Sequence, residues 1–286
     1  MGKLGLIVEG GGMKCAYSAG ILDAFLDDHI TFDYVSGVSA GCANAASYLA
    51  GQKGRNKRFY TEFIYDPGYM GVKSFLKTGD FFGLQYIYGT LTNSDGAAPL
   101  DFDAILKNPA EYVVVATDAE TGKPHYFRKE EMIKDNYLHI MASCSLPSLS
   151  HPIEIDGRKY FDGGVSDAIP IKKALADGCD RLVIIRSKKK DFVKQPEGHK
   201  AFYSLACRKY PATIKALNRR HLMYRACQAA QDKLAAQGKC FVFAPSDPPE
   251  MSTFTKDDKV EEELYELGLK DYADLKESFF NWLEKK

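Results

Sequence analysis

The chain of 286 residues lacks the features that mark several classes of protein. No stretch approaches the roughly 18 consecutive apolar residues of a membrane-spanning helix, so we expect no transmembrane segment. Glu9 interrupts the N-terminal region before a signal-type apolar run can form, which predicts that the chain is not exported. Its seven cysteines include no CxxC pair, as expected of reduced thiols rather than of disulfides or a zinc site. The sequence therefore predicts a cytoplasmic protein.

The chain also lacks any excess of charge, because 38 basic side chains balance 38 acidic ones. A neutral protein offers no global attraction for nucleic acid, and we expect no nucleic-acid partner. The balance is uneven along the chain, since residues 186–225 are strongly basic and residues 246–286 are acidic. The basic segment could dock on an anionic membrane surface, which would make the protein peripheral to the membrane. Alternatively, it forms a solvated face that pairs with the acidic segment.

What is present is the pattern of an α/β protein. Short apolar runs at 3–8, 31–35, 111–117 and 181–186 predict strands, and those at 111–117 and 181–186 are continuously apolar, as in a parallel sheet covered on both faces. Helical periodicity follows from Lys14 and again over 40–50, 212–237 and from Lys259. We predict a three-layer α/β/α fold with a mostly parallel sheet. A catalytic core at 1–190 would carry a helical C-terminal extension, 191–286, with one added strand.

The pentapeptide Gly37-Val38-Ser39-Ala40-Gly41 stands between the second predicted strand and a helix of small residues. A nucleophile elbow needs this context, because the sharp turn admits only small neighbours and presents the serine hydroxyl at a helix N-terminus. The alternative is a serine that merely caps the helix. Ser39 is the candidate nucleophile.

Three glycines, Gly10, Gly11 and Gly12, end the first predicted strand. Their backbone N–H groups could approach a reacting carbonyl closely and form an oxyanion hole. A dinucleotide-binding turn is the alternative, with Asp33 as the ribose-binding acid. That alternative departs from its pattern, because Cys15 replaces the third glycine and the end of the second strand is occupied by the serine turn.

Asp162 is the candidate general base. It follows the predicted strand 158–161 and precedes Gly163 and Gly164, which would let its carboxylate approach a neighbouring loop. The six histidines share no such context, and we interpret them as surface or structural residues. A carboxylate with its ordinary pKa near 4 is a weak base for a hydroxyl, so a Ser–Asp dyad would have to be in contact and partly desolvated.

Taken together, these motifs resemble those of the patatin-like phospholipases. EGGGMK at 9–14, GVSAG at 37–41 and DGG at 162–164 occur in the family's order, and a looser likeness surrounds residues 142–147. The resemblance implies a serine acyl-ester hydrolase that releases fatty acid from phospholipid, lysophospholipid or related lipid esters. It implies Ser39 as nucleophile, Asp162 as base and Gly10–Gly12 as oxyanion hole, supported by Lys14, Gly37, Gly41, Gly163 and Gly164, with no metal, cofactor or nucleotide.

Two further functions stay open on the sequence alone. One is a nucleotide-binding protein that uses the Gly10–Gly12 turn, and the other is a regulatory patatin-like protein without catalysis. Between the serine turn and the next apolar strand, residues 75–91 are rich in large apolar side chains. These form an acyl-chain pocket, a lipid-facing flap or a part of the ordinary core.

Overall fold

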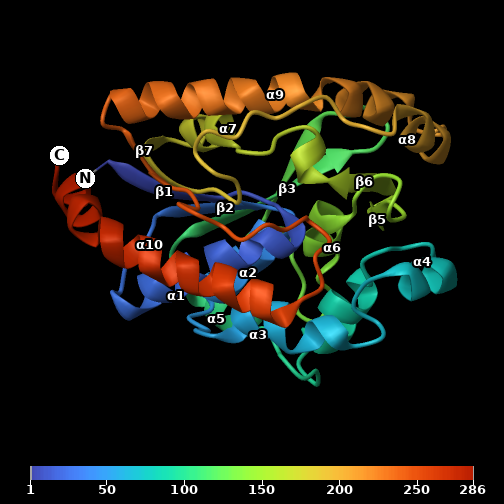
Figure 1. Cartoon of the computed structure of the whole chain (residues 1–286), viewed down its shortest axis with the longest axis horizontal. Helices are drawn as coiled ribbons and strands as arrows, with labels where there is room; N and C mark the ends of the chain where they lie inside the picture. The colour runs from blue at the N-terminus through green and yellow to red at the C-terminus, as the bar shows by residue number, and fades with distance from the viewer. Residues whose placement is uncertain (1, 286) are drawn as a thin grey trace.

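The computed structural model describes residues 2–285. An eight-stranded sheet lies at its centre with helices on both faces (Figure 1). The strand order is β5-β6-β3-β2-β1-β7-β8, and β4 pairs with β3 beside this path. Pairs within the run β3-β2-β1-β7-β8 are parallel, whereas β4, β5 and β6 are joined by antiparallel pairing. The predicted α/β fold with a mostly parallel sheet is confirmed. The strands are β1 (Lys3–Val8), β2 (Tyr34–Val38), β3 (Glu111–Asp118), β4 (Pro124–Arg128), β5 (Ile153–Ile155), β6 (Arg158–Asp162), β7 (Cys179–Ile185) and β8 (Cys240–Phe243).

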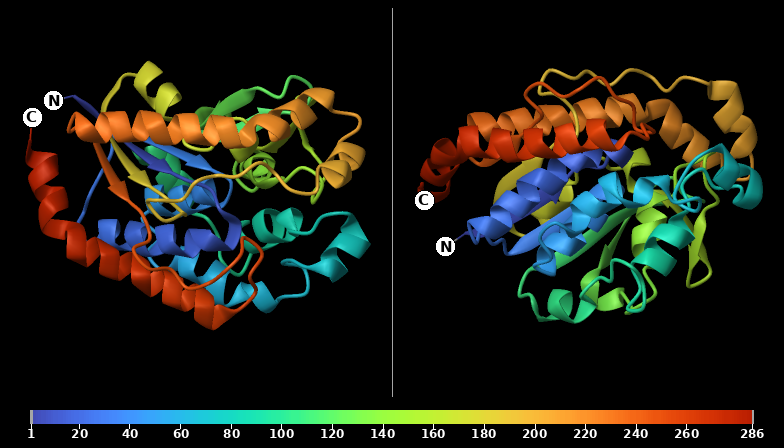
Figure 2. Two further views of the ribbon diagram at one scale, coloured as in Figure 1. Left: turned by 45° about the horizontal axis from the view of Figure 1, so that its top comes forward. Right: turned by 60° about the horizontal axis from the view of Figure 1, so that its bottom comes forward.

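Residues 2–285 contain ten α-helices, and the two longest lie on opposite faces of the sheet (Figures 1 and 2). On one face α7 and α9 pack over an apolar cluster that includes Ile7, Ile184 and Tyr224. The larger cluster lies on the other face, beneath α1, α2, α3 and α10. The helices are α1 (Ala16–Asp27), α2 (Ala40–Leu49), α3 (Arg55–Thr61), α4 (Val72–Thr78), α5 (Phe102–Lys107), α6 (Leu138–Cys144), α7 (Ile171–Ala176), α8 (Lys200–Ala206), α9 (Pro211–Ala236) and α10 (Asp258–Glu284).

The register of the sheet brings the ends of several strands to one edge. Val8 at the end of β1 is aligned with Gly37 and with Ile185, so the turns after β1, β2 and β7 emerge side by side. Val38 is aligned with Val115, and Asp162 with the next residue of β3, Ala116. Because β6 pairs with β3 only at Ala116–Asp118, the end of β3, its last residue lies at the same edge of the sheet as the turn that contains Ser39.

The prediction of the second strand at 31–35 is wrong. The strand β2 spans Tyr34–Val38 and continues to the serine turn, because Ser36 and Gly37 are fully enclosed in the sheet although neither residue type favours a strand. Asp33 precedes the strand, and its carboxylate accepts a hydrogen bond from the Leu4 N–H at 2.8 Å. It therefore lies at the opposite end of β1 from Gly10, away from the position of a ribose-binding acid.

The cysteines and the helices of residues 2–285 bear on two further predictions, that the thiols are reduced and that no helix spans a membrane. All seven cysteines are free and six of them are buried, in agreement with their interpretation as small apolar residues. No helix in this range has both the length and the apolar character required to cross a bilayer.

Candidate active site

Ser39 lies in the turn between β2 and α2 with φ 53° and ψ −138°, a backbone conformation that few non-glycine residues adopt. Strain of this kind marks functional turns, and it is the geometry of a nucleophile elbow. A Cβ on Gly37 would come within 2.3 Å of the Cys42 backbone, and a Cβ on Gly41 within 2.6 Å of the Val8 carbonyl oxygen. Both glycines are thus required by close approach of α2 to the sheet.

Ser143, a residue outside the three motifs, holds the serine turn in place through two hydrogen bonds. The backbone N–H of Ser39 donates to the hydroxyl of Ser143 at 2.8 Å, and that hydroxyl donates to the carbonyl of Val115 at 2.6 Å. Ser143 is fully buried near the end of α6, so it ties the turn after β2 to β3. The looser likeness around residues 142–147 was the sequence signal for this support.

Asp162 ends β6 and is 2 % exposed. Its Oδ1 accepts a hydrogen bond from the Gly164 N–H at 2.7 Å, and a Cβ on Gly163 would come within 2.2 Å of the Val115 carbonyl oxygen. Burial raises the pKa of this carboxyl above its ordinary value, opposed in part by the Ser39 hydroxyl and by the charge of Arg220. A raised pKa makes Asp162 a stronger base than an exposed aspartate.

The Ser39 hydroxyl is close enough to lower the pKa of Asp162, yet the pair does not meet the geometry of a standard hydrogen bond. The Oδ2 of Asp162 accordingly has no partner among residues 2–285. Catalytic hydrogen bonds are commonly long in a protein without substrate and shorten when substrate binds. The structure therefore brings the two candidate residues into one site, with one carboxylate oxygen unengaged.

The glycine turn lies against the serine turn. A Cβ on Gly10 would come within 2.7 Å of the Ser39 Cβ, so only glycine permits this approach. The N–H groups of Gly10, Gly11 and Gly12 donate no hydrogen bond to any of residues 2–285. Unengaged donors beside the Ser39 hydroxyl are what an oxyanion hole requires.

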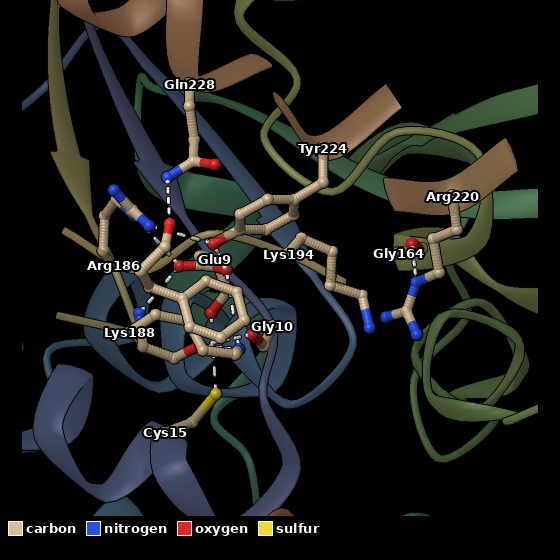
Figure 3. Close-up of polar contacts among 12 residues, drawn as sticks. Glu9, Gly10, Cys15, Gly164, Arg186, Lys188, Lys194, Arg220, Tyr224 and Gln228 are labelled. Carbon is tan, nitrogen blue, oxygen red and sulfur yellow. Dashed lines mark hydrogen bonds and ion pairs between the residues drawn. The ribbon is translucent and has the colours of Figure 1, made fainter. Parts of the chain in front are cut away.

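Glu9, directly before this turn, is 2 % exposed and holds the turn in place (Figure 3). Its carboxylate accepts hydrogen bonds from the Tyr224 hydroxyl at 2.6 Å and from the Ser187 N–H at 2.8 Å, and it lies 3.5 Å from Arg186. The Ser187 hydroxyl donates to the Gly10 carbonyl at 2.7 Å. The glycine turn is thus clamped to the end of β7 and, through Tyr224, to α9.

One cavity of about 310 Å³ contains Ser39, Asp162 and the three glycines in its lining. Its apolar wall comes from the region between α3 and the π-helical segment η3 (Gln85–Leu91), including Phe82, Ile87 and Tyr88. These three residues are buried and also line the cavity. The large apolar side chains of residues 75–91 therefore form part of the pocket wall and part of the core. Phe75 of the same cluster is 36 % exposed and does not line the cavity.

Basic residues that no motif indicated also line this cavity, namely Lys188, Lys194 and Arg220.

The proposed pairing of the basic segment with the acidic C-terminal segment is mostly wrong, since Lys189–Asp247 at 3.3 Å is the one ion pair that joins them within the described chain. The reason is topological, because α9 and α10 cover opposite faces of the sheet. Contact with an anionic membrane stays a prediction.

None of the six histidines belongs to the described lining of this cavity. His139 is buried and packs edge-on against Phe127, while His151 is exposed beside Asp80. These positions agree with the interpretation of the histidines as structural or surface residues.

Comparison with known proteins matches two parts of the chain to families, an N-terminal part and a C-terminal part. Residues 210–284 match a domain of unknown function designated DUF6363. The uncharacterized protein YjjU of Escherichia coli (strain K12) is 27% identical over 205 residues, which cover 70% of this chain and 56% of YjjU. The uncharacterized NTE family protein Rv1063c of Mycobacterium tuberculosis is 32% identical over 82 residues, 29% of this chain and 22% of that protein. The chain therefore spans about half, or less, of the length of these relatives.

A solved structure supports the fold assignment. The crystal structure of VipD from Legionella pneumophila matches 97% of this chain and 67% of the VipD chain, with a TM-score of 0.50 and 12% identity. At this identity the similarity concerns the fold alone. Residues 6–175, which include the serine turn, the glycine turn and Asp162, match the family described as patatin-like phospholipase. The chain belongs to the patatin-like phospholipase family.

Proposed function

We propose that the protein is a serine acyl-ester hydrolase with a Ser39–Asp162 dyad, acting on phospholipid, lysophospholipid or a related lipid ester. One observation carries this proposal. The strained Ser39, the buried Asp162 with an unengaged oxygen, and three glycines with unengaged N–H groups share a cavity that has an apolar wall. An acyl chain fits such a wall, because its burial releases about 0.8 kcal/mol for each methylene group.

In the first half of the reaction, the Ser39 Oγ attacks the ester carbonyl while Asp162 accepts the hydroxyl proton. The N–H groups of the glycine turn stabilise the oxyanion of the tetrahedral intermediate. The intermediate collapses by breaking the bond to the alcohol, which leaves with the proton from Asp162. An acyl group then remains on Ser39.

In the second half, Asp162 accepts a proton from water as the water attacks the acyl-enzyme. Collapse of the second intermediate breaks the bond to Ser39, which takes the proton back, and the fatty acid is released. Burial supports Asp162 in this role, because desolvation raises the pKa of the carboxyl and so its strength as a base.

The dyad is tested with purified variants and a medium-chain ester. Ser39→Ala and Asp162→Asn should each lower kcat/KM by roughly a thousandfold or more, because each removes a group that reacts in the transition state. Ser278→Ala and Asp274→Asn, at exposed positions of α10, are the matched controls and should hydrolyse the ester at the wild-type rate. Near-normal turnover by either dyad variant would refute the dyad.

A further inference from the structure

The cavity is completed by a part of the chain that lies beyond the match to the patatin-like phospholipase family. The match ends at residue 175, yet six lining residues follow it between positions 188 and 224. They come from the segment after β7 and from α9, and they are Lys188, Phe192, Lys194, Glu197, Arg220 and Tyr224. This segment therefore contributes to the site as well as covering the sheet.

Two of its cations meet over a single carboxylate. The Lys194 Nζ lies 2.6 Å from Glu197 Oε1, and the Arg220 Nη1 lies 3.1 Å from the same oxygen. Figure 3 shows the ends of the Lys194 and Arg220 side chains pointing toward one another. The Arg220 Nε donates to the Gly164 carbonyl at 2.7 Å, whereas its Nη2 donates to no group among residues 2–285. One carboxylate cannot neutralise both cations.

Lys188 adds a third cation next to the glycine turn. Its Nζ donates to the Ser187 hydroxyl at 2.8 Å and lies 3.6 Å from Glu9. Glu9 is already engaged by the buried Arg186, so it cannot fully compensate a second cation. Lys188 retains donor capacity toward the cavity.

The charges in and directly behind the cavity lining do not cancel. The cations Arg55, Lys188, Lys194 and Arg220 line the cavity together with the carboxylates Glu9, Asp162 and Glu197, and Arg186 lies directly behind Glu9, which leaves an excess of two positive charges. The side chains of Lys188, Lys194 and Arg220 are only 20–26% exposed, so they are not a solvated surface. An anionic group would offset this excess, and guanidinium and ammonium groups bind phosphate and carboxylate oxygens strongly.

We propose that Lys188, Lys194 and Arg220 form a subsite for the anionic phosphate or carboxylate group of an amphiphilic ester whose acyl chain lies along the apolar wall. That the bound molecule is an ester rests on the proposed function, whereas the anion-binding subsite itself is tested by binding alone. It assigns a role in substrate selection to the segment after residue 175.

The test uses ether analogues, which bind without being hydrolysed, and the full chain. The affinity for a 1-O-alkylglycerol 3-phosphate is compared with that for the 1-O-alkylglycerol of the same chain length, both below their critical micelle concentrations. We expect the phosphate compound to bind about tenfold or more tightly, as one charge-assisted hydrogen bond would give. Lys194→Ala should remove most of this difference, and the matched control Lys190→Ala, an exposed lysine of the same segment, should keep it.

Equal affinities for the two analogues, or equal effects of Lys194→Ala and Lys190→Ala, would overturn the subsite. Inorganic phosphate is the third ligand, and an affinity equal to that of the alkylglycerol phosphate would overturn the assignment to a lipid headgroup. A chain that binds the anionic analogue selectively but hydrolyses no ester would support the subsite while refuting the dyad. The two proposals therefore fail separately.

Discussion

The two long C-terminal helices cover opposite faces of the sheet and differ in what they contribute. Helix α10 packs with aromatic side chains, since Phe279 is fully buried with its ring 5.0–5.5 Å from those of Phe25, Phe241 and Phe243. Helix α9 contacts its face partly through polar groups, with Arg220 on Gly164 and Tyr224 on Glu9. One helix thus completes the core, while the other extends into the cavity. Stability and activity should therefore respond separately to changes in α10 and α9.

The largest effect should come from Phe279→Ala. Removing this ring leaves a cavity among six aromatic neighbours and should lower the free energy of unfolding by about 3–5 kcal/mol. Denaturant unfolding measures the loss, and ester hydrolysis per folded molecule should be unchanged because Phe279 does not line the active-site cavity. Phe280→Ala is the neighbouring control, half-buried and less costly to truncate. A loss no larger than that of the control would break the comparison.

The next largest effect should come from substituting Glu261 of α10, which should raise the free energy of unfolding. Its carboxyl is fully buried, both oxygens are without a partner among residues 2–285, and burial raises its pKa to about 9. The folded state keeps this proton while the unfolded state releases it near pH 4.5, so the stability contributed by the protonated group is lost as pH rises from 4.5 to 9.

Glu261→Gln should accordingly raise the free energy of unfolding at pH 7 by about 2–3 kcal/mol, with the gain vanishing below pH 4. Unfolding curves measured across this pH range, alongside the exposed control Glu263→Gln, test the sign. A gain that is independent of pH would show that Glu261 is already ionised in the folded protein.

The smallest of the three effects concerns α9. Tyr224→Phe removes the hydroxyl that donates to Glu9 and accepts from Arg186 at 3.0 Å, so the glycine turn loses part of its clamp. We expect kcat to fall about tenfold, equivalent to about 1.4 kcal/mol in the transition state. Tyr203→Phe removes a hydrogen bond of similar length, 2.7 Å to Asn218, away from Glu9 and should preserve kcat. An equal loss of kcat in both variants would exclude a specific role for the hydrogen bond between Tyr224 and Glu9.

The sequence was informative where backbone geometry restricts residue type. Gly37 and Gly41 are demanded by the approach of α2 to the sheet, and Gly10 by its contact with Ser39, so these positions are visible as motifs. The fold class followed from continuous apolar strands for the same local reason. The end of β2 was missed because burial in the sheet, rather than strand propensity, keeps Ser36 and Gly37 extended.

The cationic part of the cavity could not be predicted in this way. Lys188, Lys194 and Arg220 belong to a basic segment whose composition indicates only a charged face, on a membrane or against acidic residues. Their convergence depends on where α9 crosses the sheet, which is a tertiary property. Ser143 is similar, because its role depends on α6 reaching the turn after β2.

The central claim is that Ser39 is the nucleophile of an acyl hydrolase. A fluorophosphonate probe, which forms a covalent bond to an activated serine, tests it most directly when followed by peptide mapping. We predict one label per chain on Ser39, no label in Ser39→Ala, and much slower labelling in Asp162→Asn. Labelling of Ser39→Ala at the wild-type level, or no label on the folded wild-type chain, would contradict the account.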